Sequence, residues 1–329
     1  MSALRRPWTP AILLALLAPI VAEFLLGDFS IRKIGIALVL LPMYGGGALL
    51  IREVARRTGR GWPAIVLLGL AYSLLEEGFL TQSLFNPNYV GQRLLDYGYL
   101  PALGTSLNWC TLVLTIHVVW SIATPILIAE GVAADRRTEP WLRTPGMVVT
   151  SLLFVLGCAA TTAFTLKANP FVASTAQFLA AGALLVLALA GAFLIDRRPS
   201  ARITLVAPAP RRVVVFVVCL ALAVAFMLVE DRGNPNIPPA VSVVARWAIE
   251  AAAAIVLVRW SRGEGWSAHH YLAVAAATTL TYAMFGLAAF LRGHTNLGEP
   301  TGGIDIAGQI LLAGLVFLAI GWGWRSTRS

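Results

Sequence analysis

The sequence predicts an all-α protein, a polytopic membrane helix bundle of about ten transmembrane helices with both termini in the cytoplasm. Three observations support this fold class. The 329 residues are 58% hydrophobic and 12% charged, with a mean hydropathy of +0.77, so the chain is far more apolar than a soluble domain. Ten apolar segments approach the roughly 20 residues that a helix needs to cross about 30 Å of hydrocarbon. Lys and Arg form short clusters between these segments, as topology signals do.

The predicted spans follow one another along the whole chain. They cover residues 10–27, 34–51, 62–84, 106–130, 145–166, 174–195, 213–229, 239–258, 267–291 and 305–324. Because no stretch between them is long enough to fold separately, we expect a single transmembrane domain over 1–329. The first span follows basic residues, as in a secretory signal, but lacks a small-residue cleavage site before Glu23. We therefore expect it to be retained.

The basic residues test this assignment, because misplacing one span would scramble their alternation between the two sides. With the N-terminus inside, the inner segments hold Arg5, Arg6, Arg52, Arg56, Arg57, Arg60, Arg136, Arg137, Arg143, Arg197, Arg198, Arg202, Arg211, Arg212, Arg259, Arg262, Arg325 and Arg328. The outer segments hold only Arg32, Lys33, Arg93, Lys167, Arg232 and Arg292. This asymmetry, with no organelle-type signal or N-x-[ST] acceptor, predicts a multi-pass protein of a bacterial inner membrane.

Composition also excludes several classes of partner and cofactor. A net charge of +9 is compatible with nucleic-acid binding, but the short basic clusters flank spans, so the expected partner is the lipid bilayer and not nucleic acid. The three cysteines lie in apolar segments without CxxC spacing. No HExxH motif is present, and only two carboxyls and one histidine share a suitable depth, so we expect neither a metal nor another cofactor.

Candidate catalytic residues lie in the third and fourth spans. Ionisable groups within a span are costly, usually face the bundle interior and often mark function. Glu76 and Glu77 are adjacent in the third span, and His117 in the fourth lies at a similar depth for a rise of about 1.5 Å per residue. A carboxyl can act there as a general base, with the imidazole as orienting acid or base. Since adjacent residues point about 100° apart around a helix, we expect only one of the two acids to be the working carboxyl.

Polar residues at helical spacing extend this predicted site. Ser73 and Thr81 share a face with Glu77 at i−4 and i+4, and Ser121 follows His117 by four residues. We predict that Ser73, Thr81 and Ser121 line a substrate-binding pocket.

Three further ionisable groups lie within spans. Arg246 and Glu250 in the eighth span are spaced i, i+4, which suits an intrahelical ion pair, or a pair that opens to bind a charged substrate. Glu23 is near enough to the end of the first span to reach the membrane interface.

The paired acids followed by a histidine in the next helix form a pattern similar to the CAAX-protease and bacteriocin-processing (CPBP) family of intramembrane proteases. The match is EEGFLT at 76–81 and VLTIH at 113–117. It departs from that family at Thr81, where the family has arginine, at Val113, where it has phenylalanine, and in lacking a third motif. The resemblance implies a glutamate protease in which Glu76 or Glu77 activates water and His117 assists, acting on a membrane-embedded peptide or lipidated substrate.

Two other functions remain open from the residues alone. Ten spans can form two five-span halves of opposite topology, as in many small-solute or ion-coupled transporters, whose coupling sites contain intramembrane acids. Alternatively, the buried acids only specify helix packing in a non-catalytic membrane assembly protein.

Overall fold

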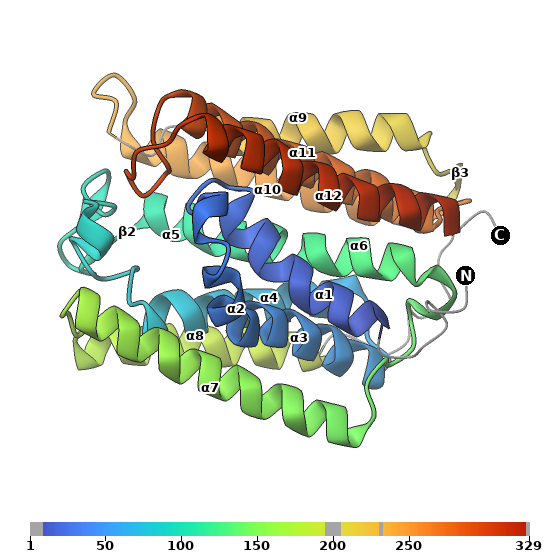
Figure 1. Cartoon of the computed structure of the whole chain (residues 1–329), viewed down its shortest axis with the longest axis horizontal. Coiled ribbons are helices and arrows are strands. Elements are labelled where there is room, and N and C mark those ends of the chain that lie inside the picture. Colours follow the sequence, from blue (N-terminus) through green and yellow to red (C-terminus); the bar gives the residue numbers. More distant parts are fainter. Residues whose placement is uncertain (1–8, 195–204, 230–232, 327–329) are drawn as a thin grey trace.

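The computed structural model describes residues 9–194, 205–229 and 233–326, and these residues are predominantly helical. The helices run along the long axis of the bundle (Figure 1). Helices α7 and α8 lie along one side, α9 to α12 lie along the other, and α1 to α6 lie between them.

The helices have the bounds α1 Thr9–Pro19, α2 Ile36–Leu40, α3 Gly46–Arg57, α4 Trp62–Leu75, α5 Leu107–Ile116, α6 Thr124–Val132, α7 Thr144–Ala168, α8 Thr175–Leu194, α9 Arg212–Leu228, α10 Pro239–Ser261, α11 Ala268–Leu291 and α12 Gly303–Ser326. Short 3₁₀ turns cover Ile31–Lys33, Tyr89–Gly91 and Ala134–Arg136. Strand β1 (Tyr99–Leu100) pairs antiparallel with β2 (Thr105–Ser106), and β3 (Leu205–Pro208) pairs parallel with β4 (Gly263–Glu264).

The predicted all-α membrane bundle is confirmed. Among the described residues, eight helices are long and apolar enough to cross a membrane. Two shorter apolar helices, Thr9–Phe24 and Arg212–Leu228, occupy the positions of the predicted first and seventh spans. The most buried spans are Trp62–Leu80 and Leu107–Val132, each with 67% of its apolar window inside the bundle, whereas α7 is only 11% buried. The helices that carry the predicted catalytic residues are therefore central, and α7 faces lipid.

A run of three glycines, Gly45 to Gly47, allows the central helices to pack closely. A Cβ added at Gly45 would lie 2.5 Å from the Ala15 carbonyl oxygen of α1. One added at Gly47 would lie 2.5 Å from the ring of Tyr72 in α4. Small residues at such contacts let helix backbones approach each other in membranes. The glycines thus bring α1 against the turn that precedes α3, and α4 against the first turn of α3.

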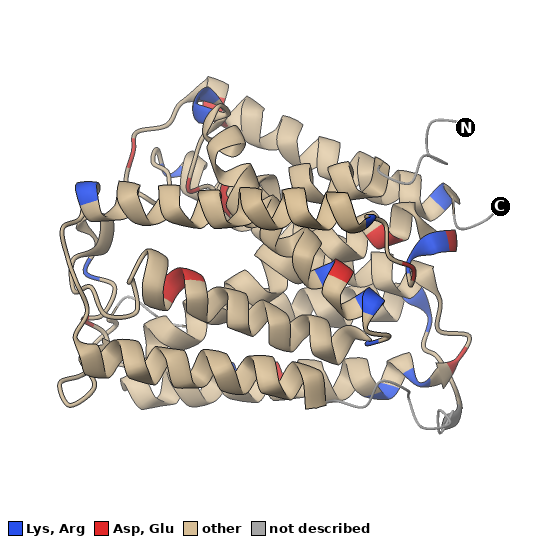
Figure 2. Ribbon diagram, turned by 90° about the horizontal axis from the view of Figure 1, so that it is seen from below, with Lys and Arg blue, Asp and Glu red and all other residues tan. Residues whose placement is uncertain are grey.

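Basic residues gather at the end of the bundle where α1 begins and α12 ends (Figure 2), and we call this the basic end. This grouping is expected, because successive spans cross in opposite directions and bring every second connecting segment to the same end of the bundle. Seven residues of the predicted charge pattern lie outside the described residues, namely Arg5, Arg6, Arg197, Arg198, Arg202, Arg232 and Arg328.

Candidate active site

Four π-helical turns occur in the described residues, and side chains from all four meet inside the bundle. The turns are Ile20–Phe24 after α1, Leu41–Gly45 between α2 and α3, Glu76–Leu80 after α4, and His117–Ala123 between α5 and α6. They supply Glu23, Tyr44, Glu76, Glu77 and His117, which we call the carboxylate–histidine cluster. Because π turns are rare and are frequent at functional sites, four of them at one cluster indicate a site maintained for function.

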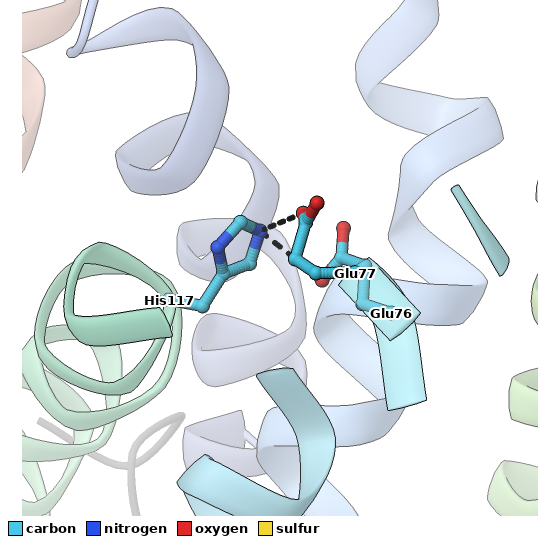
Figure 3. A group of neighbouring side chains, drawn as sticks. All are labelled: Glu76, Glu77 and His117. Atoms are coloured by element: carbon cyan, nitrogen blue, oxygen red, sulfur yellow. Dashed lines mark ion pairs between the residues drawn. The ribbon is translucent and has the colours of Figure 1, made fainter. Parts of the chain in front are cut away.

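The paired acids meet the histidine at a single ring nitrogen (Figure 3). His117 Nε2 lies 3.2 Å from Glu76 Oε2 and 3.3 Å from Glu77 Oε1. All three residues are buried, with relative exposures of 2% for Glu76, 5% for Glu77 and 7% for His117. The π turns at Glu76–Leu80 and His117–Ala123 therefore place two carboxyls and one imidazole in contact, away from lipid.

Both acids reach one atom, although the expectation of a single working carboxyl assumed that adjacent residues point about 100° apart. That expectation used the angular spacing of an α-helix, but both residues begin a π-helical turn. A π turn holds more residues per turn, so neighbours are closer in angle around the axis. Flexible glutamate side chains close the remaining gap, and both carboxyls reach the same nitrogen.

The imidazole is oriented by the backbone. His117 Nδ1 lies 2.8 Å from the carbonyl oxygen of Val113, one turn earlier in α5. A carbonyl oxygen can only accept a hydrogen bond, so Nδ1 carries a proton and donates it. In the neutral ring, Nε2 therefore presents its lone pair to the two carboxyls; in the charged ring it presents a proton to them.

The second oxygen of Glu77 is fixed by two hydroxyl groups. Thr81 Oγ1 donates to Glu77 Oε2 at 3.0 Å, and Ser83 Oγ donates to the same oxygen. Between them Gln82 adopts a left-handed backbone conformation (φ 56°), which is uncommon for a residue other than glycine. This conformation ends the helix and turns the chain so that Ser83 faces Glu77. Trp109 Nε1 in turn donates to Ser83 Oγ at 3.2 Å.

Glu23 and Tyr44 belong to the cluster, although the sequence placed Glu23 at the interface and did not single out Tyr44. Tyr44 Oη donates to Glu23 Oε1 at 2.5 Å and lies 3.4 Å from His117 Nε2. The Tyr44 ring also stacks on that imidazole, at a centroid distance of 6.1 Å. In the sequence, their membership of the cluster was indicated only by the position of Glu23 as a single acid in the first span and of Tyr44 beside the glycine run.

The loop between the third and fourth spans lies near the cluster. It contains the 3₁₀ turn Tyr89–Gly91 and the β1–β2 hairpin, and its Leu95 is 1% exposed. Burial, together with the negative charge of nearby Glu77, raises the pKa of Tyr89 well above its ordinary value. The loop therefore packs on the bundle through Leu95, with Tyr89 near Glu77.

The residues predicted to bind substrate have different positions. Thr81 contacts Glu77 directly. Ser73 Oγ donates to the backbone oxygens of Gly69 and Leu114, so it links α4 to α5. Ser121 is buried in the same π turn as His117. Their predicted role in binding a substrate stays a prediction.

Arg246 and Glu250 lie apart from the cluster, because α10 packs against α5 and α9 and not against α4. Arg246 donates to the backbone oxygens of Asn108 and Val229, at 3.1 and 3.0 Å. Its pairing with Glu250 stays a prediction. Glu250 Oε1 accepts from Thr115 Oγ1 at 2.6 Å. The helix rotation that packs α10 on α5 directs both side chains to α5 and its surroundings.

The cluster also has the composition of a metal site, which the sequence did not predict. Glu76, Glu77 and His117 each offer one ligand atom, and these atoms lie within 4.8 Å of one another.

Comparison with protein families gives one match. A family model described as an uncharacterized membrane protein family matches residues 12–324. Comparisons with curated proteins and with solved structures gave no match. The family match does not go to the CPBP proteases, so the resemblance drawn from EEGFLT and VLTIH is wrong. Two short motifs with three matching side chains are too little to identify a family, because helical membrane segments share few residue types.

Proposed function

Since the chain belongs to this uncharacterized membrane protein family and is a multi-pass membrane protein, we propose that it is a membrane-embedded hydrolase acting through Glu76, Glu77 and His117. The observation that carries this proposal is the approach of two buried carboxyls to one imidazole nitrogen, at 3.2 and 3.3 Å. Carboxyls and imidazole are the common general acids and bases of hydrolysis. The positive-inside pattern supports placing the protein in a bacterial inner membrane.

The hydrogen bonds suggest different roles for the two acids. Glu77 Oε2 is held by Thr81 and Ser83, so Glu77 is a fixed acceptor that positions the imidazole. Glu76 Oε2 is buried, receives no hydroxyl or amide hydrogen bond, and lies 3.2 Å from His117 Nε2. Because Glu76 lacks the hydroxyl donors that hold Glu77, it is the proposed general base that takes a proton from water.

The reaction follows from these roles. A water molecule loses a proton to Glu76, and its oxygen forms a bond to the carbonyl carbon of an amide or ester. The bond from that carbon to the leaving nitrogen or oxygen breaks, and the protonated His117 donates its Nε2 proton to the leaving group. The depth of the site within the third and fourth spans favours a membrane-embedded peptide or lipidated substrate.

Incorporation of ¹⁸O tests the proposal and does not require the substrate to be identified first. Proteoliposomes would be incubated in H₂¹⁸O with a heat-inactivated total membrane extract of the expression host, and carboxyl products would be analysed by mass spectrometry. We expect labelled products with the wild-type protein and none with Glu76→Gln. Glu139→Gln is the matched control, since it removes an exposed carboxyl from the loop after α6, outside the cluster. Identical labelling with wild type, Glu76→Gln and empty liposomes would overturn the proposal.

Proton-coupled transport is a second candidate, favoured by the polar chain from Glu23 through Tyr44 to His117. Such a chain can relay protons within a membrane. The cluster, however, draws on the first four spans only, whereas many transporters place their sites between two repeated halves. Acidification of pyranine-loaded proteoliposomes that is lost in Tyr44→Phe, without ¹⁸O incorporation, would favour transport over hydrolysis.

A further inference from the structure

We propose that Glu76, Glu77 and His117 bind one divalent transition-metal ion of the zinc class. This inference names a cofactor for the same site, and its chemical consequence rests on the proposed function. Metal binding itself can be measured independently of any hydrolysis.

The distances between the ligand atoms suit a shared ion. Nε2 of His117 lies 3.2 and 3.3 Å from one oxygen of each glutamate. In a tetrahedral site with bonds of about 2.0–2.1 Å, neighbouring ligand atoms are about 3.3–3.4 Å apart. A charge-assisted N–H···O bond would be shorter, at about 2.7–2.9 Å. The two nearly equal separations place both glutamate oxygens beside the same nitrogen, and all three ligand atoms lie within 4.8 Å of one another, so one cation can contact all three once the carboxyls close around it.

The surroundings of the ligands are those of a metal site. Metal-bound histidines usually donate their other ring N–H to a carboxylate or backbone carbonyl. His117 does so through Nδ1 to Val113 at 2.8 Å, which leaves Nε2 facing the acids. Ligating carboxylates are also commonly hydrogen-bonded on their second oxygen, as Glu77 is by Thr81 and Ser83.

A buried carboxyl oxygen in the site provides an independent observation. Glu76 Oε2 receives no hydrogen bond from a hydroxyl or amide, and Glu76 is 2% exposed. A buried polar atom without a partner costs about 1–3 kcal/mol. A metal ion bound to Glu76 would satisfy this oxygen.

The charge of the cluster also favours a cation. Glu76 and Glu77 face one imidazole, Glu23 accepts from Tyr44 beside it, and among the described residues no Lys or Arg forms an ion pair with any of these acids. Unpaired carboxylates within a membrane are strongly unfavourable. A divalent ion neutralises the two ligating acids, and Glu23 keeps its hydrogen bond from Tyr44.

The chemistry of the donors selects the ion. One imidazole nitrogen and two carboxylate oxygens suit zinc or a related transition metal, whereas magnesium and calcium prefer sites made of oxygen alone. Three protein ligands leave a position open for water, which is the arrangement of catalytic zinc sites. With the ion bound, Glu76 and Nε2 of His117 would act as its ligands instead of as general base and general acid, and the ion would itself supply the activated water molecule to the proposed hydrolase.

Metal content tests the inference directly. The purified full-length protein would be stripped with a chelator, loaded with Zn²⁺ alone, desalted and measured by inductively coupled plasma mass spectrometry. We expect one Zn²⁺ per chain in the wild type and in Glu139→Gln, and none in His117→Gln. Thr81→Ala keeps all three ligands, and we expect it to weaken Zn²⁺ binding about 10–100-fold by removing a hydrogen bond that orients the Glu77 carboxylate.

X-ray absorption at the zinc edge identifies the ligands, and we expect nitrogen and oxygen at about 2.0–2.2 Å with no sulfur. Zinc retained equally by His117→Gln, or a sulfur shell, would overturn the inference. A wild-type protein that binds no Zn²⁺ would also overturn the inference. If that metal-free protein still incorporates ¹⁸O, the hydrolase proposal remains supported. Stoichiometric Zn²⁺ without ¹⁸O incorporation would support the metal site and contradict the hydrolase.

Discussion

Two buried polar clusters in this bundle differ in how their charges are neutralised. At the basic end, Arg52, Glu53, Arg56 and Glu130 form what we call the arginine network. Arg52 Nη1 lies 2.6 Å from Glu53, and its Nε lies 3.1 Å from Glu130. Toward the other end of the same central helices lies the carboxylate–histidine cluster, where two carboxyls share one imidazole and a third accepts from Tyr44.

The arginine network is fully compensated. Arg56 binds Glu130 through two nitrogens, at 2.8 and 2.7 Å, which is the strong bidentate arrangement. Glu53 also accepts from the backbone amides of Trp141 and Leu142, at 2.8 and 3.1 Å. These bonds hold the loop after α6 against α3.

The two clusters therefore have different roles, structural where every charge is paired and reactive where it is not. A network in which each ion has partners fixes the fold and leaves nothing free to react. The carboxylate–histidine cluster retains an oxygen without a hydrogen bond and an excess of acids, so it can accept a proton or a cation. The following predictions test this contrast.

The largest expected effect is on activity. Glu76→Gln keeps the shape of the side chain but removes its basicity, so ¹⁸O incorporation should fall by about 10²–10⁴-fold, the usual contribution of a general base. Its melting temperature should stay unchanged or rise, because an uncompensated carboxyl is removed. A large loss of thermal stability would instead make the carboxylate–histidine cluster structural, like the arginine network.

The largest expected effect on stability is at Arg52. Arg52→Leu leaves Glu53 without its closest cation and weakens the pairing of Glu130. Breaking a buried ion pair by removing one partner costs about 3–5 kcal/mol, so denaturant unfolding in micelles should show a loss of that size. Arg52→Leu as stable as the wild type would contradict a structural role for the network.

A smaller effect is expected at Ser83. Ser83→Ala removes one hydrogen bond to Glu77 and leaves that of Thr81. A hydrogen bond to a charged group contributes about 1.5–3 kcal/mol, so unfolding free energy should fall within that range. The same measurement on Ser261→Ala, whose hydroxyl is exposed at the end of α10, provides the control. Equal stabilities of the two variants would show that Glu77 does not depend on Ser83.

No measurable effect is expected at Arg93. This residue pairs with Asp96 at 2.5 Å, but the two side chains are 76% and 50% exposed. Water and salt screen such a pair, so Arg93→Gln should unfold at the wild-type temperature. A clearly lower unfolding temperature would mean that the solvent exposure of an ion pair does not predict its contribution to stability in this protein.

Much of the architecture could be predicted because it depends on local sequence. Apolar runs such as 145–166 and 174–195 are long enough to span a bilayer, and they form α7 and α8. The pairing of Glu76 and Glu77 with His117 could be proposed from depth alone. Its geometry could not, because α-helical spacing separates two acids that a π turn brings together.

The arginine network shows the other limit of sequence analysis. In the sequence, Arg52 and Arg56 count only as inner topology signals, and Glu53 and Glu130 carry no motif. Their pairing joins residues 52 and 130, which are far apart in the chain and meet only when α3 packs beside α6. The same holds for Tyr44, which reaches Glu23 and His117 because glycines let three helices approach.

The sequence by itself determined that this is a polytopic helical membrane protein, because hydrophobic length and charge asymmetry are properties read along the chain. Only the tertiary structure decided which buried charges are compensated and which are not. The reason is that partners for a buried charge come from other helices, through rotations and π turns set by packing of the whole bundle.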